Sequence, residues 1–308
     1  MTRREMLASL LAATVARADS DSKTSRLSAI NDEIGMTNQE TVAFAKQYGI
    51  QWIELRSALV PGKLRYCETL SGSDLRDFRK RLDDNGLRAS VLDTSLLKYV
   101  LPGTVAKQRE DFYVRYFAEM GFDDEKLFRN RLDMLKRTID VAHGLGTHEI
   151  RVFSFWRVAD PAPHLPRIAE VLAEMADVAV KENCRLLIEN EGSCNVATSG
   201  ESAEILRLVP SKGLGLNYDP QNSTALEPVP FPDGYAKLPK DRIGNVHVKA
   251  EGLFGPKRPL DWGAIMHAML ADGYAGKFSL ETHRGHSAEN VKISHDCMEK
   301  MIKLIAAA

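Results

Sequence analysis

Eight short apolar runs, separated by segments of helical periodicity, constrain the fold of this chain more than any other feature of its sequence. The runs are rich in Val, Ile, Leu and Phe, and most of them show little alternation of polar and apolar residues. This is typical of parallel strands that are buried on both faces. We expect strands at residues 27–30, 52–55, 89–92, 149–153, 185–188, 213–217, 245–248 and 278–280.

Amphipathic segments fill the intervals between these runs, and most of them stop at Gly or Pro, as helices commonly do. Alternation of strand and helix implies parallel pairing with right-handed crossovers. The repeat therefore predicts an α/β fold, a single (β/α)8 TIM barrel that forms one catalytic domain over residues 21–308. We expect helices at 41–48, 73–84, 127–143, 165–181, 201–208, 260–273 and 287–305, and a loop with one short helix at 224–242, where prolines interrupt the pattern.

A doubly wound open sheet is the alternative architecture. That fold usually has a Gly-rich turn after its first strand, but residues 31–35 read Asn-Asp-Glu-Ile-Gly, and the chain contains neither GxGxxG nor a P-loop. The connection at 98–126 is long for a compact domain, and long connections are often lids. Its helical spacing over 108–120 predicts a helical insertion after strand three that covers the mouth of the barrel.

The first twenty residues resemble an export signal. Arg3 and Arg4 precede an apolar run at 6–16, and Ala-Arg-Ala at 16–18 fits a cleavage site. The paired arginines suggest a twin-arginine signal, which directs folded proteins out of the cytoplasm. The run is too short to span a bilayer. We therefore expect a periplasmic or otherwise exported protein with no stable membrane anchor; a short N-terminal helix of a cytoplasmic protein is the alternative.

The charge balance and the cysteines exclude two other classes. Lys and Arg total 41 and Asp and Glu total 42, so the net charge of −1 argues against nucleic acid as a partner held through its phosphates. The four cysteines form no CxxC pair and lack the spacing of a zinc finger. A disulfide scaffold is not expected in a chain of this length.

Ionisable residues end or interrupt the last four apolar runs, at intervals of about one strand–helix unit. They are Glu189, Asp219, His247 and Glu281. Because active sites of such barrels form at the carboxyl ends of the strands, we expect these four side chains to meet at one level. Three carboxylates and an imidazole would repel one another in an empty site, and a divalent cation would remove that repulsion. Unrelated ion pairs at the rim are the alternative. The oxygen-rich set favours one hard or borderline ion, Mn²⁺ or Mg²⁺, with Co²⁺ and Zn²⁺ as further candidates.

The sequence resembles the sugar phosphate isomerase/epimerase group of the xylose isomerase-like TIM barrel superfamily over about residues 26–306. The resemblance implies that Glu189, Asp219, His247 and Glu281 bind one divalent metal. It also implies that Glu189 and Glu281 are catalytic and exchange a proton with a ketose. The matching stretches are 52–56 (Trp-Ile-Glu-Leu-Arg), 188–190 (Ile-Glu-Asn), 217–222 (Asn-Tyr-Asp-Pro-Gln-Asn), 247–249 (His-Val-Lys), 260–262 (Leu-Asp-Trp) and 279–283 (Ser-Leu-Glu-Thr-His).

Two positions depart from the ketose epimerases of that group. Asn222 stands where they have His, and Leu253 stands where they have Arg. Those family residues grip substrate oxygens, so the departures put C3 epimerisation of a simple ketose in doubt.

Other residues are candidates for the same task. Asn222 itself, Lys249, His283 and Arg284 are expected to contact substrate, and Trp156 is a candidate apolar platform for the sugar. Arg151 is a weaker candidate. Glu54 and Arg56, which end the second run on one face, are interpreted as a structural pair.

The favoured function is therefore a metal-dependent isomerase or epimerase of a small-molecule ketose or keto sugar. It would act through proton abstraction beside a metal-bound carbonyl and an enediolate. A metal-dependent lyase acting on 3-keto-glycosides is the alternative. A non-catalytic sugar-binding barrel and an abasic-site endonuclease stay open, although the latter needs more histidines than this pattern places at the strand ends. The sequence leaves self-association into a homo-oligomer open.

Overall fold

The structure is a computed structural model that describes residues 23–60, 62–107, 123–255, 259–284 and 286–308. The expected export signal at 1–20 and the expected helix at 108–120 lie outside these residues. Within the described part, no helix combines the length and the apolar character needed to cross a membrane.

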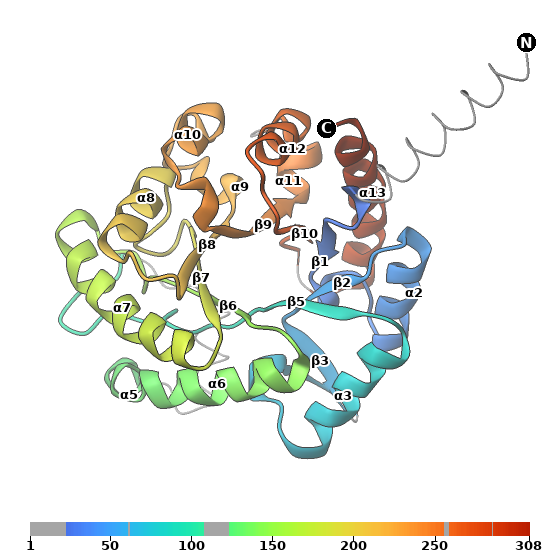
Figure 1. Cartoon of the computed structure of the whole chain (residues 1–308), viewed down its shortest axis with the longest axis horizontal. Coiled ribbons are helices and arrows are strands. Elements are labelled where there is room, and N and C mark those ends of the chain that lie inside the picture. Colours follow the sequence, from blue (N-terminus) through green and yellow to red (C-terminus); the bar gives the residue numbers. More distant parts are fainter. Residues whose placement is uncertain (1–22, 61, 108–122, 256–258, 285) are drawn as a thin grey trace, which may run out of the picture.

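Eight parallel strands form the central ring in Figure 1. They pair in the order β1-β10-β9-β8-β7-β6-β5-β2, and a parallel bridge between Ile30 and Glu54 joins the two ends of this sheet. The predicted (β/α)8 barrel is confirmed, and the open doubly wound sheet is wrong. The strands are β1 (Leu27–Ala29), β2 (Trp52–Leu55), β5 (Arg88–Leu92), β6 (Glu149–Val152), β7 (Arg185–Glu189), β8 (Leu214–Tyr218), β9 (Ile243–Lys249) and β10 (Lys277–Glu281).

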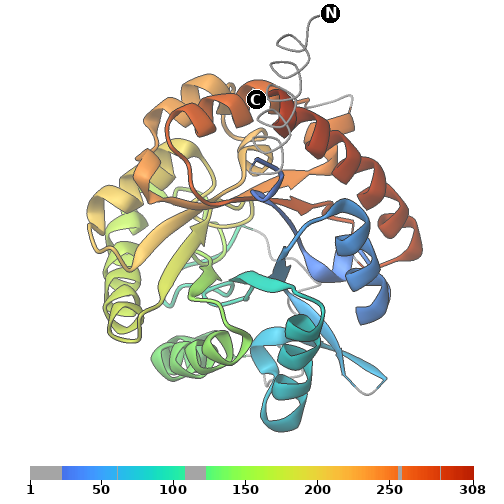
Figure 2. The same cartoon turned by 45° about the vertical axis from the view of Figure 1, so that its right-hand side comes forward.

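The long helices form an outer ring around these strands (Figures 1 and 2). Their ends follow the local signals: the Thr37 side chain caps α2, Gly49 ends it in the left-handed conformation, and a capping box of Thr198 and Glu201 begins α8. The ring contains α2 (Asn38–Tyr48), α3 (Gly72–Asp84), α6 (Arg131–Leu145), α7 (Leu165–Lys181), α8 (Ser199–Leu208), α12 (Trp262–Ala271) and α13 (Ala288–Ala307).

Short helices occupy several connections. The helix expected at 127–143 is two helices, because the chain leaves the helical conformation at Asn130, between α5 (Asp124–Arg129) and α6. The proline-rich segment at 224–242, where a loop with one short helix was expected, contains three short helical elements and no long helix. The short elements are η1 (Asn31–Glu33), η2 (Cys67–Thr69), η3 (Ala162–His164), α9 (Pro220–Ser223), η4 (Pro230–Gly234), α10 (Tyr235–Lys237), η5 (Lys240–Arg242) and α11 (Ala250–Phe254).

A β-hairpin after β2 was not expected from the sequence. It consists of β3 (Ser57–Val60) and β4 (Lys63–Tyr66), which pair antiparallel, and it projects from the barrel in Figure 2. The Asn31 side chain ties its base to the first strand–helix connection, because its amide donates to the Ser57 carbonyl and its oxygen accepts from the Arg56 N–H.

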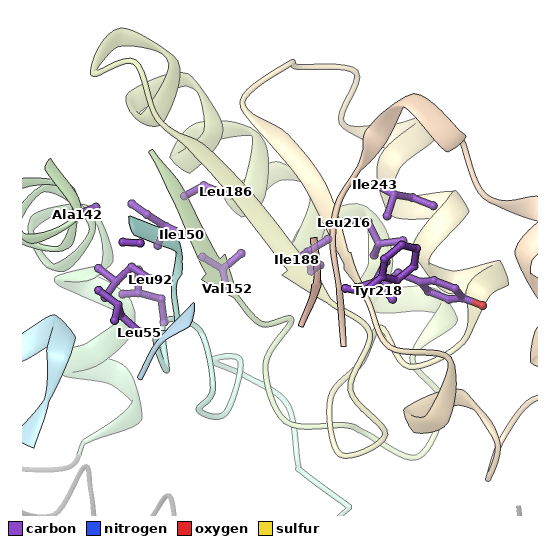
Figure 3. Close-up of a cluster of buried hydrophobic side chains, with 14 of the residues drawn as sticks. Leu55, Leu92, Ala142, Ile150, Val152, Leu186, Ile188, Leu216, Tyr218 and Ile243 are labelled. Carbon is purple, nitrogen blue, oxygen red and sulfur yellow. The ribbon is translucent and has the colours of Figure 1, made fainter. Parts of the chain in front are cut away.

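A continuous apolar core lies between the strands and the helices. Figure 3 shows part of it, with Leu186, Ile188, Leu216 and Tyr218 on neighbouring strands. All four are fully buried, and burying one such side chain contributes about 1.5–3 kcal/mol. Since side chains alternate along a strand, packing one face against the helices turns the other face into the barrel. This is what aims the polar residues of these strands at the interior.

Candidate active site at the barrel mouth

The four predicted residues meet at the carboxyl ends of four neighbouring strands. Glu189 ends β7, Glu281 ends β10, His247 lies in β9, and Asp219 follows β8 as the N-cap of α9. Each of these side chains offers a ligand atom, and these atoms lie within 4.8 Å of one another. None of the four residues is more than 4% exposed. The predicted convergence is therefore present, whereas the metal-binding role of these residues stays a prediction.

His247 is held between carboxylates on both sides of its ring. Its Nδ1 lies 3.0 Å from Glu281 Oε2 and 3.7 Å from Glu189 Oε1, and its Nε2 lies 2.8 Å from Glu54 Oε1. Burial would lower the pKa of His247, but the Glu54 and Glu281 charges raise it well above its usual range. Without a metal the ring is therefore an imidazolium. With Nε2–H donated to Glu54, Nδ1 is the atom that faces the other predicted ligands.

Glu189 is positioned by an arginine and two amides. Arg151 Nη1 lies 3.1 Å from its Oε2, Asn222 Nδ2 donates to its Oε1 at 3.1 Å, and Asn217 Nδ2 lies 3.4 Å from Oε2. Burial raises the pKa of Glu189, but Arg151 and His247 outweigh burial and lower it. Glu189 is therefore a carboxylate at neutral pH.

Arg151 also contacts Asp93, whose Oδ2 lies 3.2 Å from the same Nη1. Burial and the neighbouring Glu54 carboxylate raise the pKa of Asp93 well above its usual range, although Arg151 opposes this shift. Two buried carboxyl groups thus share one guanidinium, and the raised pKa of Asp93 reflects the excess negative charge around it.

Lys249 lies between the other two predicted ligands. Its Nζ is 2.9 Å from Asp219 Oδ2 and 3.6 Å from Glu281 Oε2, and it donates to the side-chain oxygen of Asn222. Burial raises the pKa of Glu281, but Lys249 and His247 bring it well below its usual range. The pKa of Asp219 is raised by burial in spite of Lys249.

The donor set fits a divalent cation. Among the described residues, Asp219 Oδ2 and Glu281 Oε2 are buried without a well-directed hydrogen bond, and the nitrogens that lie against them at 2.9 and 3.0 Å are the cationic groups of Lys249 and His247. Three carboxylates and one imidazole are ligands that Mn²⁺, Mg²⁺, Co²⁺ and Zn²⁺ accept. These residues could therefore hold one divalent ion.

Four of the five predicted substrate contacts line one cavity of about 510 Å³ beside this cluster: Asn222, Lys249, His283 and Arg284. Trp156 is fully buried against Phe153 and Cys194 and is not part of that lining. Its role as a platform for the sugar stays a prediction. The cavity combines cations and amides, which suits a ligand with many oxygens.

One sequence interpretation is wrong. Arg56 does not pair with Glu54 but lies 2.9 Å from both Asp32 and Glu33, because η1 brings these acids to it. Glu54 instead reaches into the barrel to His247. Burial alone would raise the pKa of Glu54, but the charge and hydrogen bond of His247 outweigh burial and lower the pKa to about 2.

Sequence reasoning missed two further carboxyl groups of the site, Glu54 as a partner of His247 and Asp93 as a partner of Arg151. Asp93 directly follows the strand β5, so the rule that selected Glu189 and Glu281 could have found it. For Glu54, the same signal was present within the run at 52–55, but its partner was misassigned.

Comparisons with known proteins agree with this fold. A family model described as "xylose isomerase-like TIM barrel" matches residues 42–301. A search of curated proteins finds no match. Among solved structures the chain is similar to an L-ribulose 3-epimerase, with 19% identity, a TM-score of 0.62 and 92% of each chain covered.

Two further solved structures are similar. One is a xylose isomerase-like TIM barrel protein from Mycobacterium smegmatis in complex with magnesium (20% identity, TM-score 0.61, covering 87% of this chain and 89% of that one). The other is 3-keto-D-glucoside 4-epimerase from E. coli (14% identity, TM-score 0.62, 90% and 98% covered). At these identities the similarity shows the fold.

Proposed function

Since the chain belongs to the xylose isomerase-like TIM barrel family, we propose that it is a divalent-metal-dependent isomerase or epimerase of a ketose or keto sugar. The observation that carries the proposal is the convergence of Glu189, Asp219, His247 and Glu281 at the mouth of the barrel. The similarity to sugar epimerases supports the substrate class. The magnesium complex of another similar protein supports a divalent metal.

The four converging residues would hold the ion, and Glu54 would orient His247 by accepting its Nε2–H. A divalent cation bound there would polarise a substrate carbonyl and stabilise the negative charge that develops beside it. Mn²⁺ is the favoured ion of this proposal, because the ligand set is mostly oxygen with one nitrogen.

Glu189 and Glu281 would move the proton. Both are ionised, since Arg151 acts on Glu189 and Lys249 acts on Glu281, and both approach His247 Nδ1. One carboxylate oxygen would remove the proton from the carbon next to the carbonyl. The other would return a proton to the opposite face of that carbon, which gives epimerisation; return to the neighbouring carbon gives isomerisation.

Lys249, Asn222, His283 and Arg284 would orient the sugar in the cavity that they line. Asn222 contacts both Glu189 and Lys249. A substrate oxygen bound by Asn222 would therefore be held close to a catalytic carboxylate. The hydroxyls of a sugar match this set of donors and acceptors.

The test is exchange of a substrate proton with solvent. Metal-loaded protein is incubated with a panel of ketoses and keto sugars in deuterated water, and incorporation is followed by mass spectrometry. We expect Glu189→Gln and Glu281→Gln, compared at equal metal loading, to lose about 10²–10⁴-fold in exchange rate. Glu204→Gln, at an exposed carboxylate paired with Arg207, serves as the control and retains exchange. Absence of deuterium from every sugar with the wild-type protein refutes the proposal.

A lyase that acts on 3-keto-glycosides is a second candidate, and two observations favour it. Asn222 and Leu253 replace the His and Arg that grip oxygens in the ketose epimerases of the resembling group, and Leu253 is buried. The same carboxylate would abstract the proton from C2, next to the 3-keto carbon. The electron pair would then form a C1–C2 double bond while the C1–O bond breaks, and the aglycone oxygen would leave and take up a proton. Release of the aglycone from a 3-keto-glycoside, but not from the parent glycoside, selects this reaction. Sugar binding without turnover selects the non-catalytic barrel.

A further inference from the structure

A second group of metal-ligand side chains lies at the opposite end of the barrel. His148 directly precedes β6, Cys184 directly precedes β7, and His143 lies in the last turn of α6. The Arg185 N–H donates to the His148 carbonyl at 2.8 Å, so the starts of the two strands are fixed side by side. The group is separated from the mouth by the length of β7, which at about 3.3 Å per residue is roughly 16 Å. It is therefore independent of the site proposed above.

The three ligand side chains are close enough to share one ion. Cys184 Sγ lies 3.3 Å from His143 Nε2, the two imidazole rings have their centroids 5.5 Å apart, and an atom of each residue lies within 4.8 Å of the others. With Zn–S near 2.3 Å and Zn–N near 2.0–2.1 Å, neighbouring ligands of a tetrahedral zinc are about 3.5 Å apart. The Cys184–His143 distance of 3.3 Å is close to this value, and rotation of the exposed His148 ring would bring in the third ligand.

The neighbouring charged pair is already balanced, because the Glu149 carboxylate lies 3.0 Å from Arg185. An ion bound by Cys184 would displace the thiol proton. His143 Nε2 lies 3.0 Å from the Glu182 carbonyl oxygen and donates to it in the metal-free protein. An ion at Nε2 would replace that hydrogen bond, and the same backbone oxygen would then lie beside the ion as a candidate fourth ligand in place of water.

We propose that His143, His148 and Cys184 form a binding site for a zinc-class transition metal ion. Thiolate and imidazole are borderline-to-soft ligands, so this site selects Zn²⁺ over Mg²⁺ and Mn²⁺, in contrast to the oxygen-rich set at the mouth. The ion would link the end of α6 to the starts of β6 and β7. Because the linked residues span 143–184, the bond would close a loop that includes α7 and would stabilise this part of the barrel.

The test uses Co²⁺, which reports sulfur ligation directly. The full-length protein is freed of metal with a chelator and titrated with Co²⁺ while its near-ultraviolet absorption is recorded. We expect a saturable thiolate-to-cobalt charge-transfer band that is displaced by Zn²⁺. The mouth site contains no sulfur, so its occupancy does not produce this band. Glu189→Gln should therefore retain the band, whatever its effect on turnover.

Substitutions assign the band to the three residues. Cys184→Ser should abolish it, and His148→Asn should weaken Co²⁺ binding at least about tenfold through loss of one ligand. His267→Asn is the matched control, because His267 is an exposed histidine on α12, outside the cluster, and it should leave the titration unchanged. Since His143 and His148 are exposed, their variants keep the test valid if Cys184→Ser fails to fold. Absence of the band in the wild type, or its persistence in folded Cys184→Ser, overturns the proposal. The contact between Cys184 and His143 would then be a hydrogen bond without a metal.

Discussion

Replacing Glu54 by Gln tests how the barrel holds His247. Both residues are fully buried, and His247 Nε2 lies 2.8 Å from Glu54 Oε1. Glu54→Gln keeps the shape of the side chain but removes its charge. The imidazolium of the metal-free protein then loses its nearest counter-charge in a place that water does not reach.

The size of the effect follows from the pKa of Glu54, which the fold lowers from 4.5 to about 2. At 1.36 kcal/mol for a tenfold change, this difference corresponds to ~3 kcal/mol of stability at neutral pH. Loss of one partner from a buried ion pair typically costs about 3–5 kcal/mol, which agrees. For a domain of this size we expect the melting temperature of the metal-free protein to fall by roughly 6–10 °C.

The same substitution should weaken metal binding. A carboxylate that accepts the second N–H of a ligating histidine typically contributes about 10–100-fold to metal affinity. Calorimetric titration with Mn²⁺ measures this, alongside thermal unfolding of the chelated protein. Glu227→Gln is the control, because Glu227 is a buried carboxylate that contacts Ser199 and Lys237 rather than the mouth. It should lower stability without changing metal affinity.

The reasoning is refuted if Glu54→Gln binds Mn²⁺ as tightly as the wild type and unfolds at the same temperature. If Glu54→Gln loses stability but keeps its Mn²⁺ affinity, the result supports the ion pair with His247 but contradicts the orienting role assigned to Glu54. Equal losses of affinity in Glu54→Gln and Glu227→Gln would mean that a general loosening of the barrel is responsible.

Four other outcomes are expected. The fold lowers the pKa of Glu54, so the contribution of Glu54 to the free energy of unfolding is complete above pH 4.5 and is lost as the pH falls toward 2. Unfolding of metal-free Glu54→Gln, followed by circular dichroism, should therefore depend less on pH over that range than unfolding of the metal-free wild type. Arg151→Met leaves two buried carboxyl groups without their shared cation and should cost about 3–5 kcal/mol in urea unfolding, whereas an unchanged midpoint contradicts the shared ion pair. Lys249→Met removes a positive charge beside the proposed ion and should strengthen Mn²⁺ binding about tenfold or more while raising KM, and weaker Mn²⁺ binding contradicts the site. We also propose that residues 1–20 direct export, so replacing Arg3 and Arg4 by Lys should retain the protein in the cytoplasm on cell fractionation, and unchanged export contradicts a twin-arginine signal.

Much of the barrel could be predicted from the sequence, because the signals for strands and helices are local. The helix at 165–181 was predicted with the bounds that α7 has, and the run at 185–188 differs from β7 by one residue. Apolar periodicity and the Gly and Pro residues at element ends are read within a few positions. The hairpin of β3 and β4 was not predicted, because its short strands do not follow the alternation of strands and helices on which the prediction was based.

The meeting of Glu189, Asp219, His247 and Glu281 was also within reach of the sequence, since equivalent positions of a repeated unit come to one level of a parallel barrel. The contacts that these side chains make could not be predicted from the sequence. Lys249 was singled out as a substrate contact, with a salt bridge to Glu281 as the alternative, and the fold places it between Asp219 and Glu281.

The sequence by itself determined the repeating strands and helices of the barrel, their order, and which polar residues end the strands. Only the tertiary structure decided how the buried charges are paired. Glu54 and His247 are separated by 193 positions, and they meet because the closed ring turns β2 and β9 toward one interior. The physical reason is that a backbone pattern is set by neighbours along the chain, whereas the electrostatic balance of a buried site depends on every strand that faces it.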